Sequence, residues 1–206
     1  MSNKKIWLIR HGESVANAKG RTSDPALVPL TQAGHDQANS IVEHFTTAPD
    51  LIIKSSYIRT TETSKPLRDK FPHIPCEIWP VHEFTYISPS RCQNTNMTDR
   101  KPFVNGYWLR ADPDYCDGEG AESFNGFLVR ARTTLSMLKS REEKFIAIFT
   151  HGQFMCGVKW LLHHKDDRNK ISDVLAFRKY ISTLAPLNGQ EMELMLSQEI
   201  CYSVIK

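Results

Sequence analysis

The segment Ile6-Trp7-Leu8-Ile9-Arg10-His11-Gly12-Glu13-Ser14 shows how this chain is organised. Its first four residues are continuously apolar, which is typical of a strand in a parallel sheet that is covered on both faces. Polar residues, including a cation and an imidazole, follow this strand at once. The runs Leu51-Ile52-Ile53 and Phe145-Ile146-Ala147-Ile148-Phe149 are apolar in the same way, and polar residues follow them too.

Segments with helical periodicity separate these strands. Ala38, Ile41, Val42 and Phe45 follow the spacing of one helix face, with Thr31 as the expected N-cap. Further helices are expected around residues 124–138 and 154–162. Strands that alternate with helices predict an α/β fold, a doubly wound and mostly parallel open sheet with helices on both faces. The tail, at 194–196 and 200–205, predicts one or two edge strands, parallel or antiparallel.

The composition is that of an ordinary globular protein, and we expect one domain over residues 1–206. Of its residues, 40% are hydrophobic and 24% charged, and the net charge of +3 gives no reason to expect a nucleic-acid partner. No apolar run has the roughly 18 residues of a membrane span. The N-terminus turns polar too soon for a secretory signal. Five cysteines without a C-x-x-C pair indicate free thiols, so a cytoplasmic location is expected.

The stretch from about Phe84 to Gly120 breaks the alternation of strands and helices. Its prolines and aromatic residues show little periodicity, which predicts an irregular insertion or lid over the active site. Such a segment is expected to set the identity of the substrate. The segment contains four cations, Arg91, Arg100, Lys101 and Arg110. They could recognise a second anionic group of a substrate, or they could simply be solvated.

Residues able to bind and transfer a phosphoryl group follow four predicted strands, which end at Ile9, Ile53, Val81 and Phe149. Ligands of doubly wound sheets bind at the carboxyl ends of the strands, so these residues are expected to meet there. Guanidinium groups suit phosphate oxygens, a neutral imidazole can attack phosphorus, and a carboxyl group can donate a proton to the leaving oxygen. This chemistry needs no metal, and the residues themselves leave open which histidine is attacked. The set comprises Arg10, His11, Arg59, Glu83 and His151.

Several short motifs connect these residues to a known family. Arg10-His11-Gly12-Glu13 matches R-H-G-[ETS], and Leu30-Thr31-Gln32-Ala33-Gly34 matches L-T-x-x-G. Ser55, Arg59, Thr60 and Thr63 match S-x-x-x-R-[AT]-x-x-T, and residues 120–123 loosely match a G-E-S element. In these motifs and their order, residues 5 to about 162 resemble the histidine phosphatase superfamily, whose fold is phosphoglycerate-mutase-like. Residues 177–198 match the family poorly.

The resemblance implies a role for each candidate residue. His11 would be the nucleophile that becomes phosphorylated, and Glu83 the general acid and then the base for water. Arg10, Arg59 and His151 would hold the phosphoryl group, and Asn17 would contact phosphate or substrate. Gly12 and Gly152 are counted with the phosphate-binding residues because they adjoin the two histidines. No cofactor and no metal ligand are expected.

Three functions are compatible with this pattern. The leading one is a metal-independent phosphatase that acts on a small phosphorylated metabolite through a phosphohistidine. The second is a mutase of the phosphoglycerate mutase type, although the short tail after the last predicted strand favours the phosphatase. The third is a module that binds phosphorylated partners without turnover, which the intact catalytic set disfavours.

Overall fold

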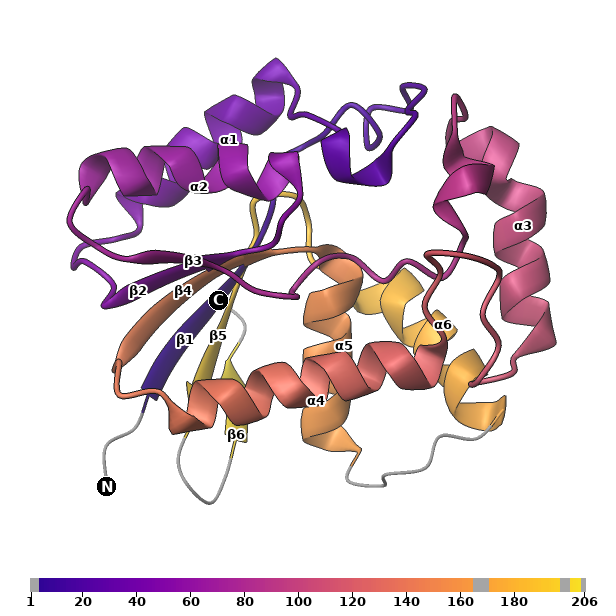
Figure 1. The fold of residues 1–206 in the computed structure, drawn as a ribbon. Helices are drawn as coiled ribbons and strands as arrows, with labels where there is room; N and C mark the ends of the chain where they lie inside the picture. The colour runs from indigo at the N-terminus through magenta and orange to yellow at the C-terminus, as the bar shows by residue number, and fades with distance from the viewer. Residues whose placement is uncertain (1–3, 165–170, 197–200, 205–206) are drawn as a thin grey trace.

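The computed structural model describes residues 4–164, 171–196 and 201–204, which contain one sheet of six strands (Figure 1). Along the chain the strands are β1 (Lys4–Arg10), β2 (Leu51–Lys54), β3 (Cys76–Ile78), β4 (Phe145–Thr150), β5 (Glu191–Leu196) and β6 (Cys201–Val204). Their order in the sheet is β3-β2-β4-β1-β5-β6. Strands β1 to β4 run parallel, whereas β5 pairs antiparallel with β1 and β6 antiparallel with β5. The tail therefore adds two antiparallel strands, of which only β6 lies at the edge.

Helices cover both faces of this sheet, as the sequence predicts (Figure 1). One face carries α1 (Gln32–Glu43) and α2 (Ile58–Lys70), and the other carries α4 (Phe124–Ser140) and α5 (Gly152–His163). Helix α6 (Ile171–Leu184) packs beside α5. Short 3₁₀ helices occupy Pro25–Leu27 and Pro89–Cys92. None of the described helices has the length and apolarity that crossing a membrane requires.

The strands form two hydrophobic cores because successive side chains point to opposite faces. In β1, Trp7 and Ile9 pack with α1 and α2 residues such as Ile41 and Leu67, whereas Ile6 and Leu8 pack with residues of α4 and α5. Both sets are buried, which explains why the strand is continuously apolar rather than alternating.

Side-chain hydrogen bonds cap the N-termini of helices α1 and α4. The Thr31 hydroxyl accepts a hydrogen bond from the Gly34 amide at the start of α1, and the Ser123 hydroxyl accepts one from Gly126 at the start of α4. Both helices are confirmed. Helix α5 begins directly after β4, so the polar residues of that junction lie at the rim of the sheet.

The prediction of an irregular segment over residues 84–120 is wrong in part. Residues Met97–Arg110 form a regular helix, α3, which begins with a capping box between Asn96 and Asp99. The helical pattern is weak in the sequence because the helix is mostly exposed and contains Pro102 and Gly106. Only Tyr107 and Trp108 are buried, and they anchor α3 to the core around Phe84.

Candidate active site

The carboxyl ends of β1 and β4 bring His11 and His151 together. Arg10 and Thr150 end the two strands as partners in register, and a histidine follows each of them. The His11 amide donates to the Thr150 carbonyl at 3.0 Å. The two imidazole rings are buried, with their centres 5.1 Å apart. The convergence expected at this rim is therefore present.

Arg59, from the first turn of α2, connects the two histidines. Its Nε donates to His11 Nε2 at 3.0 Å, and its Nη2 donates to His151 Nδ1 at 3.0 Å. Its Nη1 donates to the Pro25 carbonyl at 2.6 Å. Burial lowers the pKa of Arg59 to about 10, and the charge of Glu83 opposes this effect, so the guanidinium is a cation at neutral pH.

These contacts fix the tautomers of both imidazoles, because a guanidinium only donates. His11 Nε2 must accept from Arg59, so the proton lies on Nδ1, which donates to the Gly12 carbonyl at 2.7 Å. His151 Nδ1 also accepts from Arg59, so its Nε2 carries the proton and donates to Ser55 Oγ at 2.9 Å. The reactive lone pair of His11 is therefore on Nε2.

Both histidines are neutral at physiological pH. Burial lowers the pKa of His11 well below 6.5, and the charges of Arg59 and Arg10 act in the same direction. Burial lowers the pKa of His151 well below 6.5 as well, again with the help of Arg59. The nearby His82 has a pKa lowered to about 4, first by burial and then by the charge of Arg130.

We expect these neutral histidines to make folding stability pH-dependent on the acid side. Below pH about 6.5 the unfolded chain binds protons that the native imidazoles do not, so stability falls as the pH drops. For His82 this loss of folding stability extends from pH about 6.5 down to its pKa of about 4. The measurement is urea unfolding of the wild type and His82→Gln between pH 4 and 7.

The variant should show a shallower decrease of unfolding free energy with falling pH. Replacement of the exposed His73 by glutamine is the matched control and removes one histidine outside the site. If His82→Gln and His73→Gln change the pH slope equally, the effect does not come from the half-buried imidazole of His82.

Arg10 packs against the start of α5. Its Nη1 donates to the Pro186 carbonyl at 2.5 Å, and its buried Nε has no hydrogen-bond partner among the described residues. A Cβ on Gly152 would lie 3.3 Å from that Nε, closer than most Cβ contacts. Glycine at position 152 thus lets the guanidinium lie against the helix terminus. Burial lowers the pKa of Arg10, while the charge of Glu83 raises it.

Gly12 contributes through close backbone packing. A Cβ at this position would lie 2.4 Å from the Gly34 carbonyl oxygen, so the loop after β1 and the start of α1 cross without side chains. The Gly12 amide donates to Thr63 Oγ1 at 3.1 Å. This amide is therefore already engaged within the protein, and the contact of Gly12 with phosphate stays a prediction.

Asn17 is held in place by its side-chain oxygen. That oxygen accepts from the Ser14 amide at 3.1 Å, from the Ser14 hydroxyl at 2.9 Å and from Asn188 Nδ2 at 3.0 Å. Asn188 also donates to the carbonyls of His11 and Gly12 at 3.2 Å. Sequence reasoning missed Asn188 because it lies in the turn before β5, where the motifs give no signal.

Glu83 lies across from these residues, beside α5. Its Oε1 accepts from the Phe84 amide at 3.1 Å and from the Gln153 amide at 3.0 Å. The preceding segment is fixed by Arg130 of α4, whose Nη1 donates to the carbonyls of Pro80 and His82. Arg130 is itself paired twice with Glu122, at 2.7 Å each. The G-E-S element of the sequence therefore supports the segment that carries Glu83.

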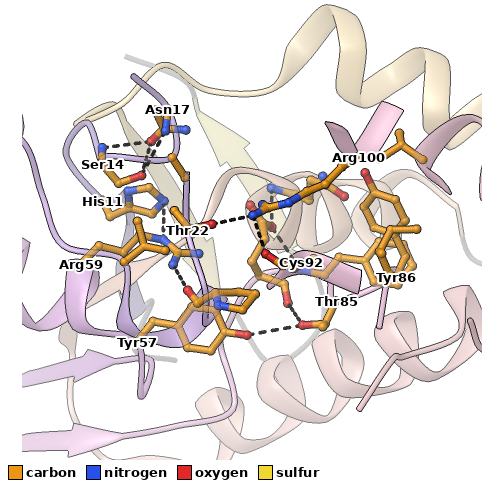
Figure 2. Close-up of a pocket in the computed structure, with 18 of the residues that line it drawn as sticks. His11, Ser14, Asn17, Thr22, Tyr57, Arg59, Thr85, Tyr86, Cys92 and Arg100 are labelled. Atoms are coloured by element: carbon orange, nitrogen blue, oxygen red, sulfur yellow. Dashed lines mark hydrogen bonds between the residues drawn. The ribbon is translucent and has the colours of Figure 1, made fainter. Parts of the chain in front are cut away.

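A cavity of about 220 Å³ lies between this set and α3 (Figure 2). Arg10, His11, Asn17, Arg59 and Glu83 line one part of it. Aromatic and aliphatic side chains line the rest, including two tyrosines that were not predicted to belong to the site. The other lining residues include Tyr57, Tyr86, Val104, Arg100 and Gln153.

Of the four cations in the 84–120 segment, only Arg100 lines this cavity. Its guanidinium donates to Thr22 Oγ1 at 2.5 Å, which joins α3 to the loop after β1 (Figure 2). It also donates to Thr95 Oγ1 at 2.8 Å. Arg91 pairs with Asp117 instead, and Arg110 lies over the ring of Tyr115. Of these four cations, Arg100 is therefore the one for which recognition of a second anionic group remains open.

Comparisons with known proteins agree with this geometry. The model of the histidine phosphatase superfamily (branch 1) matches residues 6–171. The adenosylcobalamin/alpha-ribazole phosphatase of Salmonella typhi is 36% identical over 128 residues, which span 58% of this chain and 61% of that relative. The fold resembles the alpha-ribazole phosphatase of Shigella flexneri, with a TM-score of 0.75, 20% identity and coverage of 98% and 95% of the two chains. It also resembles a phosphoserine phosphatase mutant of Entamoeba histolytica in complex with phosphoserine, with a TM-score of 0.74, 19% identity and the same coverage.

Proposed function

Since this chain belongs to the histidine phosphatase superfamily, we propose that it hydrolyses a small phosphomonoester through a phosphohistidine intermediate on His11. One observation carries the proposal. His11 is buried and neutral, and its tautomer is fixed with the lone pair on Nε2, next to the guanidinium of Arg59. An imidazole in this state is a nucleophile, and the cation beside it attracts a phosphate.

In the first step, Arg59 Nε gives up its hydrogen bond to His11 Nε2 for one to a phosphoryl oxygen, Nε2 attacks phosphorus, and the bond from phosphorus to the ester oxygen breaks. The imidazole becomes positively charged as the new bond forms. The Nδ1–H group, which donates to the Gly12 carbonyl, stabilises that charge because the carbonyl oxygen is the negative end of its dipole. The three phosphoryl oxygens are met by Arg10 and Arg59, so the negative charge is balanced without a metal ion.

His151 has a different role from that of a simple phosphate ligand. Its Nδ1 accepts from Arg59 and its Nε2 donates to Ser55, so both nitrogens are engaged within the protein. We assign it the task of orienting Arg59. A direct contact with a phosphoryl oxygen would require that the Nε2–H group of His151 exchange its hydrogen bond to Ser55 Oγ for one to that oxygen.

Glu83 is the group assigned to proton transfer. As a carboxylic acid it protonates the leaving oxygen, and as a carboxylate it then accepts a proton from the water that attacks the phosphohistidine. Water gains the phosphoryl group, the bond from phosphorus to Nε2 breaks, and inorganic phosphate leaves. The two backbone amides that bind Oε1 hold the carboxyl group in one orientation for both steps.

Hydrolysis of p-nitrophenyl phosphate with excess chelator tests the proposal. We expect turnover that the chelator does not reduce, because guanidinium and imidazole groups supply the charge stabilisation. A protein that binds phosphate or vanadate but cleaves no ester would contradict hydrolysis and favour the recognition module. Transfer of the phosphoryl group to a second hydroxyl, without release of phosphate, would favour the mutase.

A cytoplasmic location is part of the proposal and is supported by the free thiols of Cys76, Cys92, Cys116 and Cys156.

We expect Glu83→Gln to harm alkyl phosphates far more than aryl phosphates. The amide keeps the shape of the side chain but cannot donate a proton of useful acidity, which costs roughly 10²–10⁴-fold for a poor leaving group. Nitrophenolate leaves without protonation, so its esters should lose much less. The measurement is kcat/KM for both ester classes. The control is Glu119→Gln, which changes an exposed carboxylate in the loop before α4. Equal losses on both ester classes for Glu83→Gln would show that Glu83 is not the acid.

A further inference from the structure

A second cavity adjoins the one that contains His11. It measures about 310 Å³, and Arg10, Glu83, Val104 and Gln153 line both cavities. His11 and Arg59 line only the first. The second cavity, which we call the α6 chamber, is completed by Trp108, Gly152 and Ala185 and by the α6 residues Arg178, Ile181 and Ser182. Glu83 thus stands at the boundary between the reacting histidine and a further space.

Arg178 brings a positive charge to the α6 chamber. Its Nη2 donates to the neutral side chain of Asn105 at 3.3 Å, and no carboxylate of the described residues lies within ion-pair distance of it. Arg130 and Arg141, by contrast, are paired with glutamates. A cation that lines a cavity without an acidic partner is available to an anionic ligand.

Gln153 adds a polar group at the same boundary. Its side-chain oxygen is buried and has no hydrogen-bond partner among the described residues. A buried polar atom without a partner costs free energy, which a ligand group would recover. Because the two ends of an amide can exchange by rotation, this side chain can accept from a hydroxyl or donate to an anionic oxygen.

We propose that the α6 chamber binds a second anionic group on the alcohol part of the substrate, with Arg178 as the residue that selects for it. This inference rests on the proposed phosphatase function and names the substrate class as a phosphomonoester of an acidic alcohol. The leaving oxygen must lie at Glu83 to be protonated, and Glu83 also lines the α6 chamber, so the substituent of that oxygen can enter it. The apolar side chains of Val104, Trp108 and Ile181 form part of the wall that the carbon chain of such a substrate would contact.

Arg178 lies outside the segment that the family model matches. Helix α6 lies almost entirely outside the matched segment, which ends at residue 171. The catalytic residues all lie within that segment. Selection by Arg178 would therefore be a property of this chain's own C-terminal part, added to a reaction centre that the family shares.

Three matched esters test the proposal: propyl phosphate, 3-phosphonooxypropanoate and 1,3-propanediol bisphosphate. They share one carbon chain and differ in the group at its far end, which is a methyl group, a carboxylate or a second phosphate. We expect Arg178→Ala to lower kcat/KM for one or both acidic esters by roughly 10–100-fold, as expected for a lost charge-assisted hydrogen bond. Propyl phosphate should change by less than about threefold, because it does not reach the guanidinium. Lys179→Ala, the exposed neighbour on α6, is the control and should change none of them.

The outcomes separate this proposal from the proposed function. Equal losses on all three esters, or no loss on either acidic ester, would overturn the role of Arg178 while leaving the phosphatase intact. A larger loss on one acidic ester identifies the group as carboxylate or phosphate. If the wild type cleaves no ester, the proposed function fails. The chamber is then tested by calorimetry with the same three compounds, where tighter binding of an acidic ester that Arg178→Ala abolishes supports it and equal binding overturns it.

Discussion

Replacement of His11 by alanine is expected to lower kcat for p-nitrophenyl phosphate by about 10⁴-fold or more, because no other group can form the covalent intermediate. Of the two imidazoles, His11 lines the cavity together with Arg10 and Arg59, whereas His151 does not line it. The measurement is steady-state hydrolysis together with a search for a phosphorylated protein by mass spectrometry. The wild type should carry the phosphoryl group on His11, and the variant should not.

The variant should remain folded. Alanine leaves Arg59 Nε without its partner and opens a small cavity, which costs roughly 1–3 kcal/mol of stability. His11→Gln, which retains a polar side chain, is the second variant and guards against a loss of activity through unfolding. Circular dichroism and urea unfolding establish the fold of both. Activity of either folded variant within tenfold of the wild type would refute His11 as the nucleophile.

Replacement of Arg59 by lysine is expected to lower kcat/KM by about 10³-fold, although the charge is retained. The guanidinium uses three nitrogens on three different partners, namely His11, His151 and Pro25. An ammonium group has one nitrogen and cannot hold both imidazoles and a phosphoryl oxygen at once. The substitution therefore loses both the orientation of the histidines and the bidentate contact with phosphate.

The matched control for this variant is Arg68→Lys, the same change on the same helix. Arg68 donates to the Thr61 carbonyl and does not line the cavity, so its replacement should leave kcat/KM unchanged within about twofold. Comparable losses in the two variants would show that α2 as a whole, rather than the guanidinium at position 59, is sensitive to this change. Vanadate binding, measured for both variants, reports on the phosphate site without turnover.

Several residues hold the catalytic groups in place without taking part in the proposed reaction themselves. Ser55 accepts from His151, and Thr63 accepts from the Gly12 amide. Asn188 donates to the carbonyl of His11. Arg130 holds the segment before Glu83 through two backbone carbonyls. Because a shift of a reacting group by about 1 Å can cost 10²-fold in rate, these contacts matter to the proposed chemistry as much as to stability.

Most of the fold could be predicted from local patterns. The apolar runs at 6–9, 51–53 and 145–149 are strands because both of their faces are buried, and that burial leaves a trace in sequence. The helices after Thr31 and before residue 140 carry caps and one apolar face, which are also local features. Helix α3 has a capping box at Asn96 and Asp99 but no apolar face, since it is mostly exposed and its two buried aromatic residues are adjacent rather than spaced by a turn.

The sequence by itself determined the parallel sheet and the identities of the residues at its rim, His11, Arg59, Glu83 and His151 among them. A strand and the residue that follows it are neighbours along the chain, so this information is local. Tertiary structure alone decided which nitrogen of each histidine is protonated, because that depends on Arg59 arriving from another helix. It also decided that Asn188 meets Asn17 and that Arg178 shares a chamber with Glu83. Those contacts join segments far apart in the sequence, and only the packing of the sheet and its helices brings them together.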